Sequence, residues 1–179
     1  MKRAAASLKD ANLALAESVI DADHHIDFLE RNVDEMGISL LARQAPVASD
    51  LRTVVSAMRL AATLERMGDL ARHVAYIARG RFPHTATDGA AYDLLTTMAA
   101  QAAAVGKKVS QPVETQDLAL AKEIEDDDEI LDDYHRHSFD LVLDESNKLS
   151  RQEVVDVVLL GRFLERYGDR LVSRPIKGT

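Results

Sequence analysis

Apolar side chains recur at helical spacing along most of the chain. Between Leu13 and Leu41 they follow one another at intervals of three, four or seven residues, which places them on one side of a helix. This helix is expected to end near Gln44, because a proline at position 46 disfavours helical backbone just before it. Strand-like alternation of apolar and polar residues is hard to find. The pattern therefore predicts an all-α fold.

Four further helices follow from the same pattern. The second is expected over residues 51–79, with Ser49 or Asp50 as its N-cap. A polar linker over residues 82–89 then forms the candidate boundary between two parts of the chain. We predict the other helices over residues 92–109, 117–148 and 152–173, with Pro112 and Pro175 outside the periodic segments.

The chain contains an internal repeat. The segment NLALAESVIDADHHIDFL, which begins at Asn12, matches DLALAKEIEDDDEILDDY, which begins at Asp117, at an offset of 105. The words LERMGD and LERYGD end at Asp69 and Asp169, an offset of 100. Self-similarity over such lengths indicates two similar units in tandem. We therefore predict two three-helix bundles, a first repeat over residues 1–82 and a second over residues 90–179.

The first helix of the first unit is expected to be short. Only eleven residues precede Asn12, whereas a full helix precedes Asp117. Each helix of a bundle covers the apolar stripes of its neighbours, so the offset predicts that roughly fifteen to twenty helical residues are missing. The apolar surface left bare favours a homodimer. The last helix is also expected to be shorter than its counterpart, because Pro175 and Gly178 follow soon after Asp169.

The composition of the chain excludes some classes of partner and indicates the cellular compartment. The formal net charge is −8, and no run of basic residues is interleaved with aromatic ones, so nucleic-acid binding is not expected. The chain has no cysteine, which excludes disulfides and thiolate metal sites and fits a reducing compartment. No signal peptide is evident, and no apolar stretch has the length of a membrane span. We expect a cytoplasmic protein that reaches the inner face of a membrane only through partners.

Four pairs of acidic side chains lie one helical turn apart. Like charges at this spacing repel by about a few tenths of a kcal/mol, so each pair is mildly unfavourable unless a cation lies between its members. Two carboxylates from each of two neighbouring helices supply four hard oxygen donors. One metal site per unit is therefore expected, holding iron, zinc, manganese or magnesium. The candidate ligands are Asp23, Asp27, Glu65 and Asp69 in the first unit, and Asp128, Asp132, Glu165 and Asp169 in the second.

The residues leave several points about these sites open. An acidic pair on a helix is more often a solvated face than a metal site, and the repetition in both units is what weakens that interpretation. Periodicity does not decide whether the core-facing stripe of the second helix contains Leu51 and Val55 or Met67 and Val74. An imidazole ligand is conceivable, because His24, His25, His135 and His137 adjoin the acidic pairs.

The LERMGD and LERYGD words each contain an arginine and a glycine at the same positions. Arg66 and Arg166 could pair with neighbouring carboxylates. Gly68 and Gly168 each cost about 1 kcal/mol of helix propensity relative to alanine, which suggests that another group approaches the backbone closely. Both words therefore mark positions where two helices or a ligand come close together.

Two segments resemble a known family. QAPVASDLR at residues 44–52, followed by LERMGD, is similar to the signature of the PhoU family, and residues 154–169 resemble its second repeat. The resemblance covers nearly the whole chain and implies paired three-helix bundles that bind metal at the eight acidic residues. It also implies a regulator of phosphate uptake and phosphate-starvation signalling, which connects the ATPase subunit of a phosphate ABC transporter to a sensor histidine kinase. The intact signature favours the first metal site.

Two other functions compete with this one. A ferritin-like di-metal enzyme needs Glu-x-x-His ligands, and no glutamate here is followed three residues later by histidine. A metal-free adaptor would use the acidic faces only to attract a basic partner. No nucleophile elbow or phosphate-cradling glycine loop is present, so no catalytic activity is expected.

Overall fold

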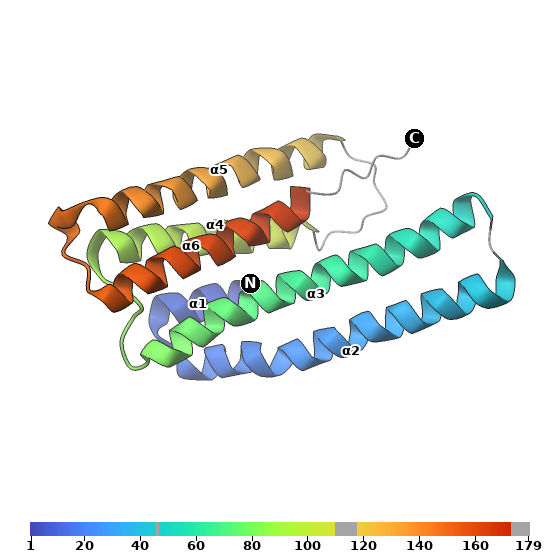
Figure 1. The fold of residues 1–179 in the computed structure, drawn as a ribbon, viewed down its shortest axis with the longest axis horizontal. Helices are drawn as coiled ribbons and strands as arrows, with labels where there is room; N and C mark the ends of the chain where they lie inside the picture. Colours follow the sequence, from blue (N-terminus) through green and yellow to red (C-terminus); the bar gives the residue numbers. More distant parts are fainter. Residues whose placement is uncertain (46, 110–117, 173–179) are drawn as a thin grey trace.

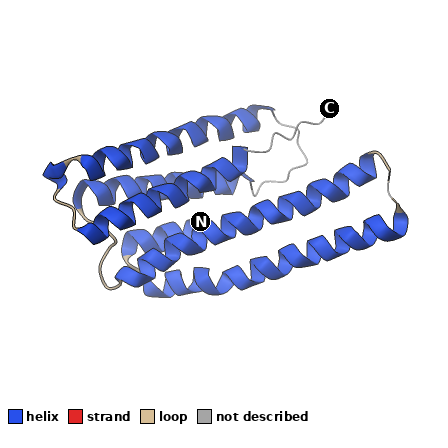
Figure 2. Ribbon diagram, viewed as in Figure 1, coloured by secondary structure: helices blue, strands red, loops and turns tan. Residues whose placement is uncertain are grey.

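All regular structure in the described residues is helical (Figure 2). The computed structural model describes residues 1–45, 47–109 and 118–172. The elements are α1 (Lys2–Asp10), α2 (Leu13–Gln44), α3 (Ser49–Arg81), α4 (Gly89–Val109), α5 (Leu118–Leu143), the 3-10 turn η1 (Glu145–Asn147) and α6 (Arg151–Val172). The predicted all-α fold is confirmed, and none of these helices is long and apolar enough to cross a membrane.

The helices form two antiparallel three-helix bundles in tandem (Figure 1). The first contains α1, α2 and α3, and the second contains α4, α5 and α6. The bundles meet where α3 packs against α6 and α1 packs against α4. The tandem arrangement predicted from the repeat is therefore confirmed, while the boundaries 1–82 and 90–179 of two separate domains stay a prediction.

The first helix is short, as expected. α1 has 9 residues, whereas its counterpart α4 has 21. The hairpin of α2 and α3 consequently extends past the other helices (Figure 1). A groove of about 790 Å³ opens beside Met1; it is lined mainly by α2 and α3 and also by α1, Gly106 of α4 and Tyr167 of α6. Several large apolar side chains of the hairpin remain exposed, including Met36, Ile38, Val47 and Leu51. A homodimer that covers this surface stays a prediction.

Most of the buried core lies between α3, α4 and α6. The second half of α3 contributes Met67 and Val74, which are 6% and 0% exposed, whereas Leu51 is 41% exposed. In this half of α3 the stripe with Met67 and Val74 faces the core, whereas Leu60 and Leu64, earlier on the same stripe, are 37% and 44% exposed. Neither stripe therefore faces the core along the whole helix. α6 contributes Leu160 and Leu164, both fully buried.

Two helix ends differ from the sequence prediction. The N-cap of α3 is Ala48, in a positive-φ conformation, and neither Ser49 nor Asp50 caps the helix because both lie inside it. The predicted end of the helix over residues 117–148 is also wrong, since α5 already ends at Leu143. There the Asp144 side chain accepts a hydrogen bond from the backbone N–H of Ser146 at 2.9 Å and starts the 3-10 turn.

An ion pair ties the end of α3 to α6. Arg81 donates from Nε and Nη2 to the carboxylate of Asp156, at 2.5 and 2.9 Å. Asp156 is only 1% exposed, and Gln152 donates a further hydrogen bond to it at 3.1 Å. The buried negative charge of Asp156 in the second bundle is thus balanced by Arg81 of the first bundle.

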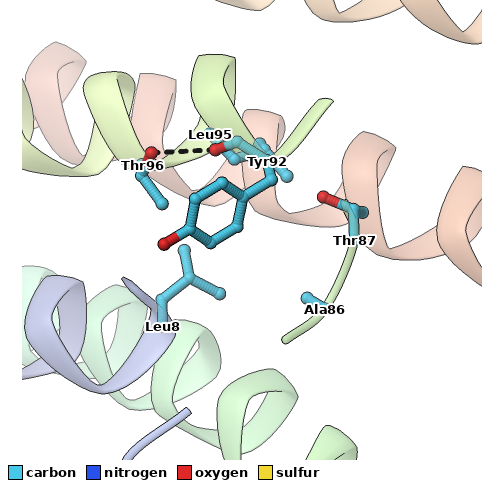
Figure 3. Close-up of a pocket in the computed structure, with 6 residues that line it drawn as sticks. All are labelled: Leu8, Ala86, Thr87, Tyr92, Leu95 and Thr96. Carbon is cyan, nitrogen blue, oxygen red and sulfur yellow. Dashed lines mark hydrogen bonds between the residues drawn. The ribbon is translucent and has the colours of Figure 1, made fainter. Parts of the chain in front are cut away.

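The linker between the bundles is partly buried, although its sequence is polar. Figure 3 shows Ala86 and Thr87 beside Leu8 of α1 and Tyr92 of α4. Ala86 and Thr87 are 7% and 4% exposed. The Tyr92 hydroxyl donates to the backbone carbonyl of Lys9 at 3.0 Å, which joins α4 to the end of α1. At this end of the molecule, contacts among α1, the linker and α4 therefore hold the two bundles together.

Candidate metal centres

The first four candidate ligands lie on the facing helices α2 and α3. Asp23 is 2% exposed, and Asp27, Glu65 and Asp69 are half-buried. Burial raises the pKa of Glu65, and the negative charges of Asp69 and Asp27 raise it further. The structure therefore brings the two acidic pairs of the first unit close enough to influence one another. We call these four residues the first cluster.

An arginine lies within the first cluster. Arg72, one turn after Asp69 on α3, forms ion pairs with Asp23 on α2 and with Asp69, the latter at 2.6 Å between Nη2 and Oδ1. Its side chain is 24% exposed. A guanidinium group thus already supplies positive charge between the two helices.

The hydrogen bonding of the first cluster is incomplete. Among the described residues, the buried Oδ1 of Asp23 and the buried Nε of Arg72 have no hydrogen-bond partner. Burial raises the pKa of Asp23, and the nearby charge of Arg72 opposes that effect. Gly68 lies opposite, where a Cβ atom would be 3.4 Å from Asp23 Oδ1 and 2.9 Å from Ile26 Cδ1. The close approach of helices suggested by this glycine is present.

The second four candidate ligands lie on α5 and α6, and we call them the second cluster. One carboxylate oxygen from each of Asp132, Glu165 and Asp169 lies within 4.8 Å of the other two. Donor oxygens around a six-coordinate ion are about 3 to 4 Å apart, so small side-chain adjustments would bring these three into coordination. Glu165 is 8% exposed and Asp132 is exposed, which places the three oxygens at the edge of the bundle.

Asp128 completes the second cluster from its buried side. Its Oδ1 atom is buried and has no hydrogen-bond partner within the described part of the chain. Gly168 makes room for this carboxylate, because a Cβ atom at that position would lie 2.5 Å from Asp128 Oδ1. Burial raises the pKa of Asp128 to about 6, and the charges of Asp169 and Asp132 contribute. A cation beside this carboxyl group would favour its ionised form and lower its pKa.

Arg162 and His135 border the second cluster. Arg162 donates from Nη1 to both carboxylate oxygens of Glu165, at 2.9 and 2.8 Å, and its side chain is 51% exposed. The Nε2 atom of His135 is buried without a hydrogen-bond partner among the described residues. Burial lowers the pKa of His135, and Arg162 lowers it further, so the imidazole is held neutral and able to donate a lone pair.

Sequence reasoning missed the two arginines that contact the clusters. It named Arg66 and Arg166, which are both exposed. Arg72 and Arg162 lie three residues from Asp69 and Glu165, a spacing at which helical side chains meet. That spacing was available as a signal. Of the four histidines considered, His24, His25 and His137 are exposed, and only His135 is half-buried beside a cluster.

The stability of the metal-free protein is expected to depend on pH near 6. The folded state holds a proton on Asp128 up to about pH 6, whereas the ordinary aspartate value is 3.8. Between these values the folded state binds more protons, so its stability falls as the pH rises and then levels off above 6. The melting temperature in EDTA should therefore increase when the pH is lowered from 7.5 to 5.5. An Asp128→Asn variant should lose most of this increase, and an unchanged pH dependence would contradict the assignment.

Comparison with known proteins agrees with the duplicated architecture. The model of the PhoU domain family matches residues 1–78 and again residues 95–173. The phosphate-specific transport system accessory protein PhoU homolog 2 of Mycobacterium tuberculosis is 41% identical over 97% of this chain and 81% of its own length. PhoU homolog 1 of Mycobacterium leprae is 38% identical over 97% of this chain and 78% of its own.

Solved structures show the same fold. The crystal structure of PhoU from Pseudomonas aeruginosa superimposes with a TM-score of 0.73 at 27% identity, covering 96% of this chain and 83% of that one. PhoU from Streptococcus pneumoniae, a phosphate transport system regulatory protein, gives a TM-score of 0.79 at 24% identity, covering 96% and 81%. The family model matches both repeats, and the relatives match almost the entire chain, so this chain belongs to the PhoU family.

Proposed function

We propose that this chain regulates phosphate uptake as an accessory protein of a phosphate-specific transport system. The proposal is supported by family membership and by relatives that carry this description and align with nearly the full chain. Its action is regulatory and involves no catalysis.

The regulator works as a metal-binding adaptor. The single observation that carries this part is the group of Asp132, Glu165 and Asp169, whose carboxylate oxygens lie within 4.8 Å of one another. An all-carboxylate set suits a hard cation such as iron, manganese or magnesium, and zinc is a further candidate. Asp128 and His135 offer buried atoms that have no hydrogen-bond partner among the described residues. A bound cation would reduce the repulsion between these carboxylates and fix α5 against α6.

The adaptor connects two proteins at the inner face of the membrane. By similarity to the family, the partners are the ATPase subunit of the phosphate ABC transporter and a sensor histidine kinase. The chain carries a formal charge of −8, which steers it toward basic surfaces of a partner. In this proposal a homodimer in the cytoplasm presents one surface when metal is bound and another when it is absent.

Metal binding is tested by removing ligands of the second cluster. The Glu165→Gln/Asp169→Asn variant should lose at least about tenfold in affinity for Mn²⁺, because two of its four carboxylates become neutral. Asp133→Asn is the matched control, since Asp133 is exposed on α5 and pairs with Arg136 outside the cluster. Isothermal titration and elemental analysis of the full-length chain measure the bound metal. Equal Mn²⁺ binding by the variant and the wild type would contradict the second cluster as the site.

The adaptor role is tested separately, by pull-down with the purified ATPase subunit and the kinase, each with Mn²⁺ and with EDTA. Binding to both partners supports the role, and binding to neither overturns it. A metal-free adaptor remains the second candidate, because Arg72 and Arg162 already supply positive charge to the clusters. It predicts partner binding that EDTA leaves unchanged.

A further inference from the structure

We propose that the two acidic clusters are unequal, and that Arg72 is a built-in cation of the first cluster that keeps metal out of it. Metal is then taken up by the second cluster. This inference rests on the metal-binding part of the proposed function. It reverses the preference for the first site that the QAPVASDLR signature suggests.

The contacts of Arg72 place its charge where a metal ion would have to lie. Its guanidinium pairs with Asp23 from α2 and with Asp69 from α3, one ligand from each helix of the cluster. An ion bound to the same two carboxylates would lie within a few ångströms of the guanidinium. Two like charges at such a short separation repel strongly, because little water screens them there. Metal and Arg72 therefore compete for Asp23 and Asp69.

Arg72 is held in this position by its surroundings. Only 24% of its side chain is exposed, its Nε is buried, and Asp23 is 2% exposed. The guanidinium carbon also lies 6.0 Å from the centre of the Tyr76 ring, on the same helix. Unless another cation replaces it, moving the arginine away would leave a buried aspartate without its charge partner, which is strongly unfavourable.

The position of the second unit that corresponds to Arg72 holds an uncharged residue. At the repeat offset of 100, the residue that corresponds to Arg72 is Val172, which carries no charge. Arg162 contacts the cluster through Glu165, from the same helix and three residues away. Because 51% of its side chain is exposed, it can turn into water at little cost, as for most surface ion pairs. A metal ion can therefore displace Arg162 far more easily than Arg72.

The inference is tested by counting Mn²⁺ ions bound to the full-length chain in a matched set of variants. In the wild-type background, Asp23→Asn/Asp69→Asn should leave Mn²⁺ binding unchanged, whereas Glu165→Gln/Asp169→Asn should weaken it by at least about tenfold. Arg72→Met should add Mn²⁺ binding, and the added ions should persist when Arg72→Met is combined with Glu165→Gln/Asp169→Asn. Arg79→Met is the control, since Arg79 is exposed on the same helix and contacts the same Tyr76 ring, with its guanidinium carbon 5.1 Å from the ring centre. Circular dichroism confirms folding, and Arg72→Gln replaces Arg72→Met if the latter unfolds.

The possible outcomes separate this inference from the proposed function. If Asp23→Asn/Asp69→Asn loses as much metal as Glu165→Gln/Asp169→Asn, both clusters bind metal and the inequality is overturned while the metal-binding adaptor stands. If Arg72→Met and Arg72→Gln add no Mn²⁺, Arg72 is not what excludes metal and the inference fails. If no variant and no wild-type sample binds Mn²⁺, the inference fails together with the metal-binding part of the proposed function.

Discussion

Replacing Arg81 with alanine is expected to lower the free energy of unfolding by about 3 to 5 kcal/mol. Asp156 is 1% exposed and receives two hydrogen bonds from Arg81, so the substitution leaves a buried carboxylate with Gln152 as its remaining side-chain partner. An unpaired buried charge is much more costly than the pair is favourable. Urea unfolding followed by circular dichroism measures the change.

Arg79 provides the control for this experiment. It lies two residues earlier on α3, is exposed, and contacts the ring of Tyr76, with 5.1 Å between the guanidinium carbon and the ring centre. Arg79→Ala should therefore cost no more than about 1 kcal/mol. The double variant Arg81→Ala/Asp156→Leu should recover much of the loss, because it removes the buried charge itself. A loss below about 1 kcal/mol for Arg81→Ala would show that the ion pair does not hold the bundles together.

A second large loss of stability, about 2 to 5 kcal/mol, is expected when Leu160 is replaced by alanine. Leu160 is fully buried in α6, the helix that packs against α3, α4 and α5. The truncation removes apolar contact and leaves a cavity among helices of both bundles. Thermal and urea unfolding measure the effect.

The adjacent residue offers a matched comparison. Leu159 is 40% exposed, so Leu159→Ala makes the same chemical change on the outer side of α6 and should cost about 1 kcal/mol or less. Similar losses for the two variants would mean that α6 does not present Leu160 to the core.

The sequence was sufficient to predict the helices and their duplication, because both depend on spacing along the chain. Residues 12–44 and the repeated LERMGD and LERYGD words required no knowledge of neighbouring helices. Details set by a local hydrogen bond were missed. The end of α5 is an example, since Asp144 there accepts a bond from Ser146 and turns the chain, which helical periodicity does not register.

The candidate site was predictable in its residues but not in its charge balance. The eight acidic positions follow from the repeat, and the structure brings both sets of helices together. The role of Arg72 was missed because its partner Asp23 is 49 residues away, and only the packing of α2 against α3 reveals the contact. The QAPVASDLR signature favoured the first site, yet its described residues lie at the far end of the hairpin from the carboxylates.

Because the hairpin of α2 and α3 protrudes, a small tilt of α3 at the first cluster produces a larger displacement at the tip of the hairpin. From Asp69 to its first residue, Ser49, α3 is an uninterrupted helix about 30 Å long. With the ion pairs of Arg72 as the fulcrum, this helix is a lever arm: a tilt of about 5° at Asp69 displaces the tip by about 2.5 Å at that length. A small rearrangement at the first cluster is thus magnified at the exposed apolar tip of the hairpin.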